Sequence, residues 1–186
     1  MNRIEAMTQL GDDLNVSPVP DSISGIVSLL GGTRAAAGLI PGDAKITSKQ
    51  RTLQRYLRAE RGETGKNVRG QSAEKRSAFT ARLRQAVIDD QCAAVRAKHP
   101  HGFRAKVKGK FFLSYAQPGR SIVAVTIPRA DMDNIVEFIQ DEEYARAADL
   151  FDRAFAASYA PDGSLDEMRF GEDDADPDAF DSLTIS

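Results

Sequence analysis

The sequence has no tryptophan, one cysteine, two histidines and no long apolar run. With Cys92 alone, no internal disulfide forms, which fits a reducing compartment. No stretch approaches the ~18 apolar residues that can span a bilayer, and residues 1–10 lack the apolar centre of a signal peptide. Arginine outnumbers lysine 17 to 8, a bias associated with bacteria of high G+C content. We therefore expect a cytoplasmic bacterial protein without a membrane segment.

Motifs that mark catalytic, metal and cofactor sites are also missing. The chain has no Gly-rich phosphate loop, no nucleophile elbow and no Cys-X-X-Cys pair. His99 and His101 flank a proline and, together with Cys92, fit no standard zinc spacing. The acidic cluster at 172–178 lacks the glycine and terminal Glu of an EF-hand, so we interpret it as a solvated tail or a mimic of DNA. We expect no enzyme activity, no metal and no cofactor.

Charge is sorted by position, although the net charge is only −2. Residues 45–110 contain 18 Lys or Arg and 5 Asp or Glu, whereas residues 111–186 contain 5 and 17. A dense basic block followed by an acidic half indicates a polyanion-binding unit joined to a unit of another kind. Nucleic acid, and DNA in particular, is the partner that this pattern favours, and the protein would then be associated with the nucleoid.

The first hundred residues favour helices. Residues 1–20 lack strong periodicity and end in a pair of prolines, which predicts a flexible arm. Apolar spacing and the breakers Gly31-Gly32 and Pro41-Gly42 predict short helices at 23–30, 33–40 and 48–58, the last capped by Thr47 or Ser48. A longer helix is expected from Ser72 to near His99.

The period changes to two after residue 102, which predicts strands. Residues 103–111 alternate apolar and cationic side chains, residues 117–120 suit a type II turn, and residues 121–127 read as a second strand, so we expect a hairpin. Helical sequence follows to Tyr159, as one long helix or as two that meet near Asp141. Residues 165–170 suit a short strand, and residues 179–185 suit a final strand or a disordered tail.

These elements predict an α+β protein, with a helix-turn-helix-like N-terminal domain before a small domain of β-hairpin and helices. We expect four parts: a flexible arm at residues 1–20, a helical DNA-binding domain at 21–100, an α+β domain at 101–170 and an acidic tail at 171–186. An apolar stripe in the third part is large for so small a unit to bury, which predicts a homodimer or a partner surface. Its residues are Ile135, Val136, Ile139, Phe151 and Phe155.

Three short helices in this order resemble a helix-turn-helix, whose last helix enters the major groove. Arg51, Arg55 and Arg58 share one side of the predicted third helix, opposite its apolar stripe. Arginine and glutamine suit base edges, and the residues at a helix start suit phosphate. The predicted DNA contacts here are Thr47, Ser48, Lys49, Arg51, Gln54, Arg55 and Arg58. The alternative is a solvated helix in a small bundle, and the interval from Pro41 to Thr47 exceeds the usual turn.

The cationic face of the first strand is a second predicted DNA contact. Alternate residues of a strand lie about 6.6 Å apart, close to the phosphate spacing along one DNA strand. This favours contact with the backbone over reading of bases. The cationic residues are Arg104, Lys106, Lys108 and Lys110. The alternative is an edge strand that uses its lysines to prevent aggregation.

Several short motifs follow one another in an order with a known counterpart. They are GTRAAA at Gly32–Ala37, RTLQRY at Arg51–Tyr56, YAQP at Tyr115–Pro118, VTIP at Val125–Pro128 and a helical stretch up to Tyr159. This order resembles that of the telomere-protecting terminal proteins of actinobacterial linear replicons. The resemblance implies a DNA-binding protein that acts at linear DNA ends, of chromosomes or plasmids, and becomes joined to a 5′ end through a side-chain hydroxyl that primes a polymerase.

The chain departs from that family where the hydroxyl is expected. The family's attachment threonine lies in the loop before the strand that ends here at Pro128, but this loop is shorter and has no threonine. Ser121 is the nearest hydroxyl, with Arg120 beside it. A serine hydroxyl is a poor nucleophile by itself, so the polymerase would supply the metal ions and the deprotonation.

Three functions stay open. The first is a terminal protein of linear DNA that works with a DNA polymerase or another replication protein. The second is a helix-turn-helix repressor or a plasmid or phage replication initiator, which needs the same helix and no acceptor hydroxyl. The third is an interaction protein whose acidic half recruits a basic partner.

Overall fold

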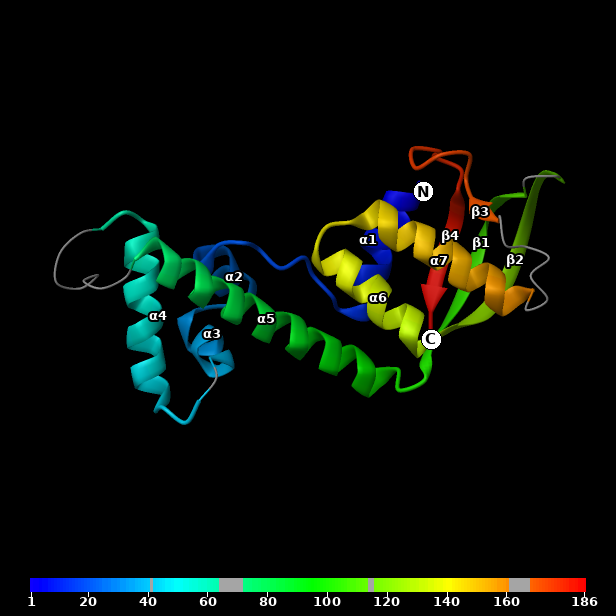
Figure 1. The fold of residues 1–186 in the computed structure, drawn as a ribbon. Coiled ribbons are helices and arrows are strands. Elements are labelled where there is room, and N and C mark those ends of the chain that lie inside the picture. Colours follow the sequence, from blue (N-terminus) through cyan, green and yellow to red (C-terminus); the bar gives the residue numbers. More distant parts are fainter. Residues whose placement is uncertain (41, 64–71, 114–115, 161–167) are drawn as a thin grey trace. The chain divides into compact units, whose positions relative to one another are not determined.

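The computed structural model describes residues 1–40, 42–63, 72–113, 116–160 and 168–186, with strand side chains described up to Phe112 and again from Val123. In these ranges the chain forms seven helices and four strands (Figure 1). The helices are α1 (Arg3–Leu14), α2 (Ile23–Leu29), α3 (Thr33–Leu39), α4 (Ile46–Glu60), α5 (Ala73–Lys98), α6 (Arg129–Gln140) and α7 (Tyr144–Tyr159). The strands are β1 (Gly102–Leu113), β2 (Ala116–Pro128), β3 (Arg169–Phe170) and β4 (Phe180–Ile185).

The predicted α+β class is confirmed, since a helical region precedes the strands. The short helices α2, α3 and α4 lie where apolar spacing predicted them, and α5 covers the longer predicted helix. Helical sequence after β2 forms two helices, with a left-handed residue at Glu142 (φ 59°) between them. A non-glycine residue with this φ cannot continue an α-helix, which explains the break.

The chain divides into two compact units. The helical unit is Val19–Asp90, and the sheet unit combines Met1–Pro18 with Gln91–Ser186. Helix α5 contributes residues 73–90 to the first unit and 91–98 to the second. The first residues of the chain therefore belong with its last ones, whereas the sequence predicted a separate arm.

The predicted flexible arm is wrong, because residues 3–14 form helix α1. Its N-terminus carries a capping box. The Asn2 side chain accepts from the Glu5 backbone N–H at 2.8 Å, and the Glu5 carboxylate accepts from the Asn2 backbone N–H at 2.9 Å. Met7, Leu10 and Leu14 recur at three and four residues and are buried in the sheet unit. Burial of this face holds α1 in the core.

All four strands belong to one antiparallel sheet in which β1 is central. Strand β2 pairs along one side of β1, and β4 and β3 pair along the other. The predicted turn at residues 117–120 is wrong, since these residues lie in β2, with Gly119 opposite Phe111. The register shifts by one residue between Phe111 and Leu113, and Pro118 is accommodated at this bulge of an edge strand. Residues 114–115, which join the strands, lie outside the described residues.

The C-terminus forms a strand, so the predicted acidic tail over residues 171–186 is wrong for its last part. Strand β4 pairs with β1 from Ala105 to Gly109 and buries Phe180 and Leu183. The acidic residues before it form a turn in which Asp176 accepts hydrogen bonds from the backbone N–H groups of Glu172 and Asp178, at 2.8 and 2.9 Å.

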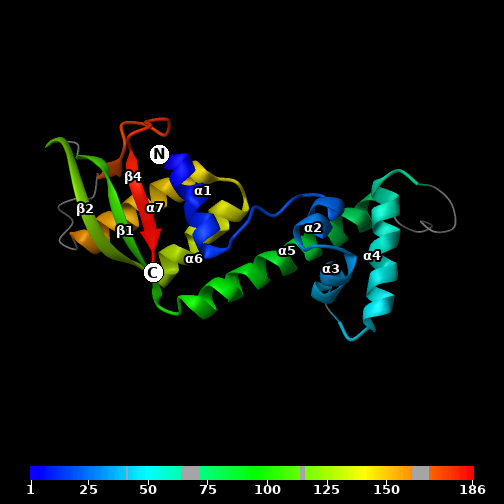
Figure 2. The same ribbon diagram turned by 180° about the vertical axis from the view of Figure 1, so that it is seen from behind.

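Helices α1, α6 and α7 cover one face of the sheet, as the two opposite views show (Figures 1 and 2). The inward side chains of β1 are apolar and buried, including Phe103, Ala105 and Val107. The apolar stripe of α6 and α7 that suggested a homodimer is buried in this same core. It therefore gives no reason to expect a second copy of the chain.

A buried ion cluster joins α1 to α7 and the acidic turn. The Arg3 guanidinium, 3% exposed, donates to Asp149 at 2.7 Å, to Asp152 at 2.8 Å and to Asp174. Asp152 also accepts from the Phe170 N–H at 3.2 Å. Burial raises the pKa of Asp152 to about 7, against the opposing effects of Arg3 and of the Phe170 hydrogen bond.

We expect the Asp152→Asn variant to lose part of the pH dependence of stability. The folded protein keeps a proton on Asp152 up to about pH 7, whereas the unfolded chain releases it near 3.8. Between these values the folded state binds more protons, so this group makes the unfolding free energy fall as pH rises, by at most about 1.4 kcal/mol per unit. Urea denaturation between about pH 4 and 8 measures this contribution.

The matched control is Asp149→Asn, which removes an exposed partner of the same arginine. In this variant, Asp152 should still make the unfolding free energy fall as pH rises. Equal pH dependence of the wild type and Asp152→Asn would contradict the raised pKa.

Candidate nucleic-acid interface

Helix α4 is amphipathic, and its buried face fixes the direction of its charged face. Leu53, Tyr56 and Leu57 are buried in the core of the helical unit. The Tyr56 ring stacks on Phe79 of α5, with centroids 4.1 Å apart and planes within 6°. This apolar contact sets the rotation of α4 about its axis, so the residues between the buried positions point to solvent.

The exposed face of α4 carries four of the predicted DNA-contacting residues. Arg51, Gln54, Arg55 and Arg58 are all exposed. Within the described part of the chain, Arg51 and Arg55 form no ion pair, whereas Arg58 lies 3.9 Å from Glu63 in an exposed pair. Exposed ion pairs contribute little, so Arg58 is also free to exchange partners. We call Arg51, Gln54, Arg55 and Arg58 the α4 face.

The start of α4 differs from the prediction. The N-cap is Lys45, without a side-chain cap, and not Thr47 or Ser48. Thr47 and Ser48 are exposed, as expected for residues that contact phosphate. Lys49 is half-buried instead, and its Nζ donates to the Ile40 carbonyl at the end of α3, at 2.6 Å. Lys49 therefore joins two helices, which weakens its assignment as a DNA contact.

A carboxylate joins the end of α4 to the start of α2. Glu60 accepts hydrogen bonds from the backbone N–H groups of Ile23 and Ser24, at 2.8 and 2.9 Å. Burial acts to raise the pKa of Glu60, but the hydrogen bonds from Ser24 and Ile23 outweigh it, and the pKa is lowered.

The connection between α3 and α4 runs over residues 40–45, longer than the usual turn of a helix-turn-helix.

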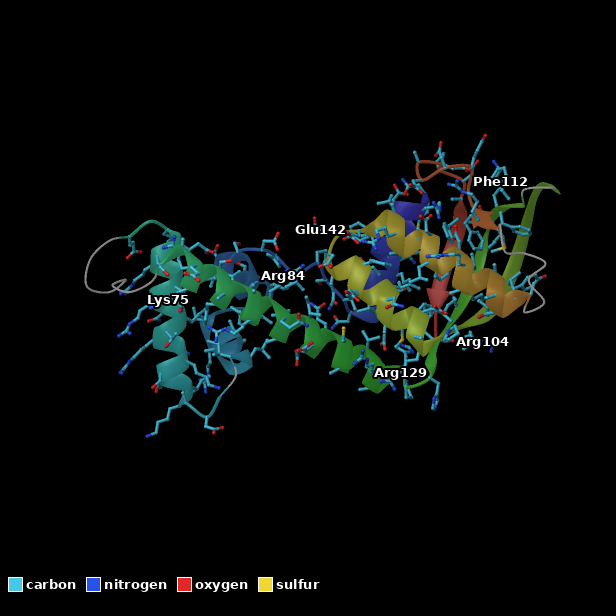
Figure 3. All side chains as sticks on the ribbon, viewed as in Figure 1. Lys75, Arg84, Arg104, Phe112, Arg129 and Glu142 are labelled. Carbon is cyan, nitrogen blue, oxygen red and sulfur yellow. The ribbon has the colours of Figure 1, made fainter. Side chains whose placement is uncertain are left out.

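Strand β1 carries the second cationic face, on the side of the sheet away from the helices. Arg104, Lys106 and Lys108 are exposed and Lys110 is half-buried; Arg104 is labelled in Figure 3. Because β1 is the central strand, the alternative of a protected edge strand is wrong. The described cross-strand neighbours on this face are small or hydroxylic, so they leave the cations open to solvent. They are Ala124, Thr126, Ser182 and Thr184.

Acidic neighbours neutralise one half of this strand face. Lys108 lies 3.3 Å from Asp181, and Lys110 lies 3.8 Å from Asp176 and over the Phe112 ring. Arg104 and Lys106 have no acidic partner among the described residues. We call Arg104 and Lys106 the β1 face, because these two cations are the ones left for an external anion.

Ser121 does not lie at a hairpin tip. Its backbone is in β2, opposite Gly109 of β1, and its side chain lies outside those described. Three further hydroxyls nearby in the sequence compete with it as acceptors, those of Ser114, Tyr115 and Thr126. Ser114 and Tyr115 lie outside the described residues, and Thr126 is exposed on β2.

The predicted absence of a zinc site concerned Cys92, His99 and His101. Across the described ranges no group of three or more His, Cys, Asp or Glu side chains is placed to hold a metal ion. Cys92 contacts Gln140 at 3.7 Å, and His99 packs edge-on against Phe103.

Among the described residues, no helix combines the length and apolarity that crossing a membrane requires.

The α4 face and the β1 face also belong to the part of the chain whose composition is strongly basic. Both lie within the basic block at 45–110, and each has an apolar face opposite it in the same element. Comparison with protein-family models, with curated proteins and with solved structures found no match for this chain.

Proposed function

We propose that this protein binds DNA, with the α4 face as the part that reads sequence. The observation that carries the proposal is the pair of exposed arginines, Arg51 and Arg55, one turn apart on a helix whose opposite side is buried. Arginine and glutamine donate to guanine and adenine edges in the major groove. A helix that presents Arg51, Gln54 and Arg55 on one side has the chemistry for such contacts.

The β1 face supports the proposal as a backbone contact. Arg104 and Lys106 alternate along an exposed strand and lack acidic partners among the described residues. Strand spacing of about 6.6 Å between them suits neighbouring phosphates. Such contacts add affinity without sequence preference.

Within DNA binding, we propose a role at the ends of linear DNA, of the terminal-protein type. Its support is the order of the motifs around Gly32–Ala37, Arg51–Tyr56 and Val125–Pro128, and the second of these contains Arg51 and Arg55 of the α4 face. In this role a DNA polymerase would be the partner, a side-chain hydroxyl such as that of Ser121 would receive the first nucleotide, and the protein would be found at the nucleoid.

A repressor or replication initiator is the second candidate. The observation that favours it is the position of Ser121 inside the β1–β2 ladder, and not in a projecting turn. A repressor or initiator uses the α4 face and needs no acceptor hydroxyl. The two candidates therefore share their DNA contacts and differ in nucleotide transfer.

Affinity for duplex DNA should fall steeply with salt. Each phosphate neutralised contributes about −0.9 to the slope of log affinity against log salt. Fluorescence anisotropy with a labelled random duplex measures the slope, and Lys106→Ala should reduce its magnitude by about one. Binding that does not change with salt, or no binding, would contradict the proposal.

Replacing Arg51 or Arg55 with Ala should weaken binding to a preferred site more than binding to random DNA. Each lost base contact costs about 1–3 kcal/mol at a duplex enriched from random sequences. The matched control is Arg153→Ala, which removes an exposed arginine of α7, outside both candidate faces. Equal losses on both DNAs would make Arg51 and Arg55 backbone contacts.

Nucleotide transfer separates the two candidates. If the protein is a primer, it becomes labelled by a radioactive deoxynucleotide when its cognate polymerase and a divalent metal are present, and Ser121→Ala loses the label. Thr126→Val, on the same strand, serves as the control and keeps it. Undiminished labelling of Ser121→Ala would exclude Ser121, and unlabelled wild type would favour the repressor or initiator.

A further inference from the structure

The helical unit contains a partly enclosed cavity of about 270 Å³ that the proposed function does not use. Its walls come from α4, α5 and the end of α3. The lining residues are Ile40, Thr52, Tyr56, Phe79, Arg82 and Leu83. Among these, Tyr56, Phe79 and Leu83 are buried, so the walls are mostly apolar.

Two aromatic rings form part of the wall. Tyr56 and Phe79 stack almost in parallel, so each fixes the other's orientation. Since both rings belong to the core of the unit, this wall is held rigidly before any ligand arrives. A rigid aromatic wall favours a planar apolar ligand.

One cation stands beside this apolar surface. The Arg82 Nε donates to the Ala78 carbonyl of its own helix at 3.2 Å, which orients the side chain and leaves the two terminal nitrogens for a ligand. Among the described residues Arg82 has no acidic partner. Thr52 directs its hydroxyl to the Ser48 carbonyl at 3.0 Å, so that donor is already used.

We propose that this cavity binds a small organic anion with a flat apolar body, such as an aromatic carboxylate. The aromatic and aliphatic walls would take the body, and Arg82 would take the carboxylate through charge-assisted hydrogen bonds. A cavity of about 150 Å³ accommodates benzene, so this larger one has room for two fused rings. A folded peptide segment is too large for it. The proposal does not depend on DNA binding.

The matched probes 1-naphthoate and 1-naphthalenemethanol test this, because they share the ring system and differ in charge. Isothermal titration calorimetry should show naphthoate binding about tenfold more tightly than the alcohol. Arg82→Gln should remove this preference and leave the affinity for the alcohol unchanged. Arg34→Gln, which removes an exposed arginine that is not among the described lining residues, should behave as the wild type.

Filling the cavity provides an independent test of where the probes bind. Ile40 and Thr52 are half-buried, so Ile40→Phe and Thr52→Phe should fill the space and abolish binding of both probes. Circular dichroism shows which of these variants is folded, and NMR shifts of the Tyr56 and Phe79 rings on naphthoate binding locate the site in the wild type.

Three affinity results would overturn the proposal. They are absence of naphthoate binding at millimolar concentration, equal affinity for the two probes in the wild type, and a preference for naphthoate that survives in Arg82→Gln. Ring shifts confined to Tyr144 and Tyr159 of the sheet unit would place the ligand elsewhere and would overturn it too.

Discussion

The central strand β1 is the constraint on which the sheet unit depends. Its backbone pairs on one side with β2, which follows it closely in sequence, and on the other with β4 and β3, which are distant in sequence. Its register is fixed on both faces, since a slip by one residue would bury Arg104 and expose Phe103. Gly109 adds a local requirement, because a Cβ there would lie 2.4 Å from the Ala179 carbonyl oxygen.

In both candidate DNA-binding faces, burial of apolar residues determines where the charged residues point. On β1, burial of Phe103 forces Arg104 outward, and on α4, burial of Tyr56 directs Arg55 to solvent. Apolar contact is the larger contribution, and the position of the charges follows from it. Because period two and period 3.6 were both visible in the sequence, both faces were predictable before the structure.

Features that depend on contacts between distant residues were not predictable in this way. The cluster of Arg3 with Asp152 joins residues 149 positions apart, and no local pattern signals it. Helix α1 does have a local signal, the capping box of Asn2 and Glu5, but weak periodicity and the two prolines that follow favour a flexible arm. The composition of residues 117–120 suits a turn, but continued pairing with β1 keeps them in a strand.

The cavity beside Tyr56 shows another limit of sequence analysis. Tyr56 and Phe79 are apolar residues of two predicted helices, and both are buried. That they stack on one another and leave space beside Arg82 depends on how α4 and α5 pack, which periodicity does not specify. Sequence patterns indicate which face of a helix is buried and not how completely it is filled.

The division of the chain has a consequence for its synthesis on the ribosome. The helical unit is one continuous segment, so it can fold as soon as its last residue has emerged. Helix α1 is made well before its partners in α7 and β4, and its apolar face must wait for them. The sheet unit therefore closes only after β4 has been made, and α1 stays unprotected while the whole helical unit is synthesised.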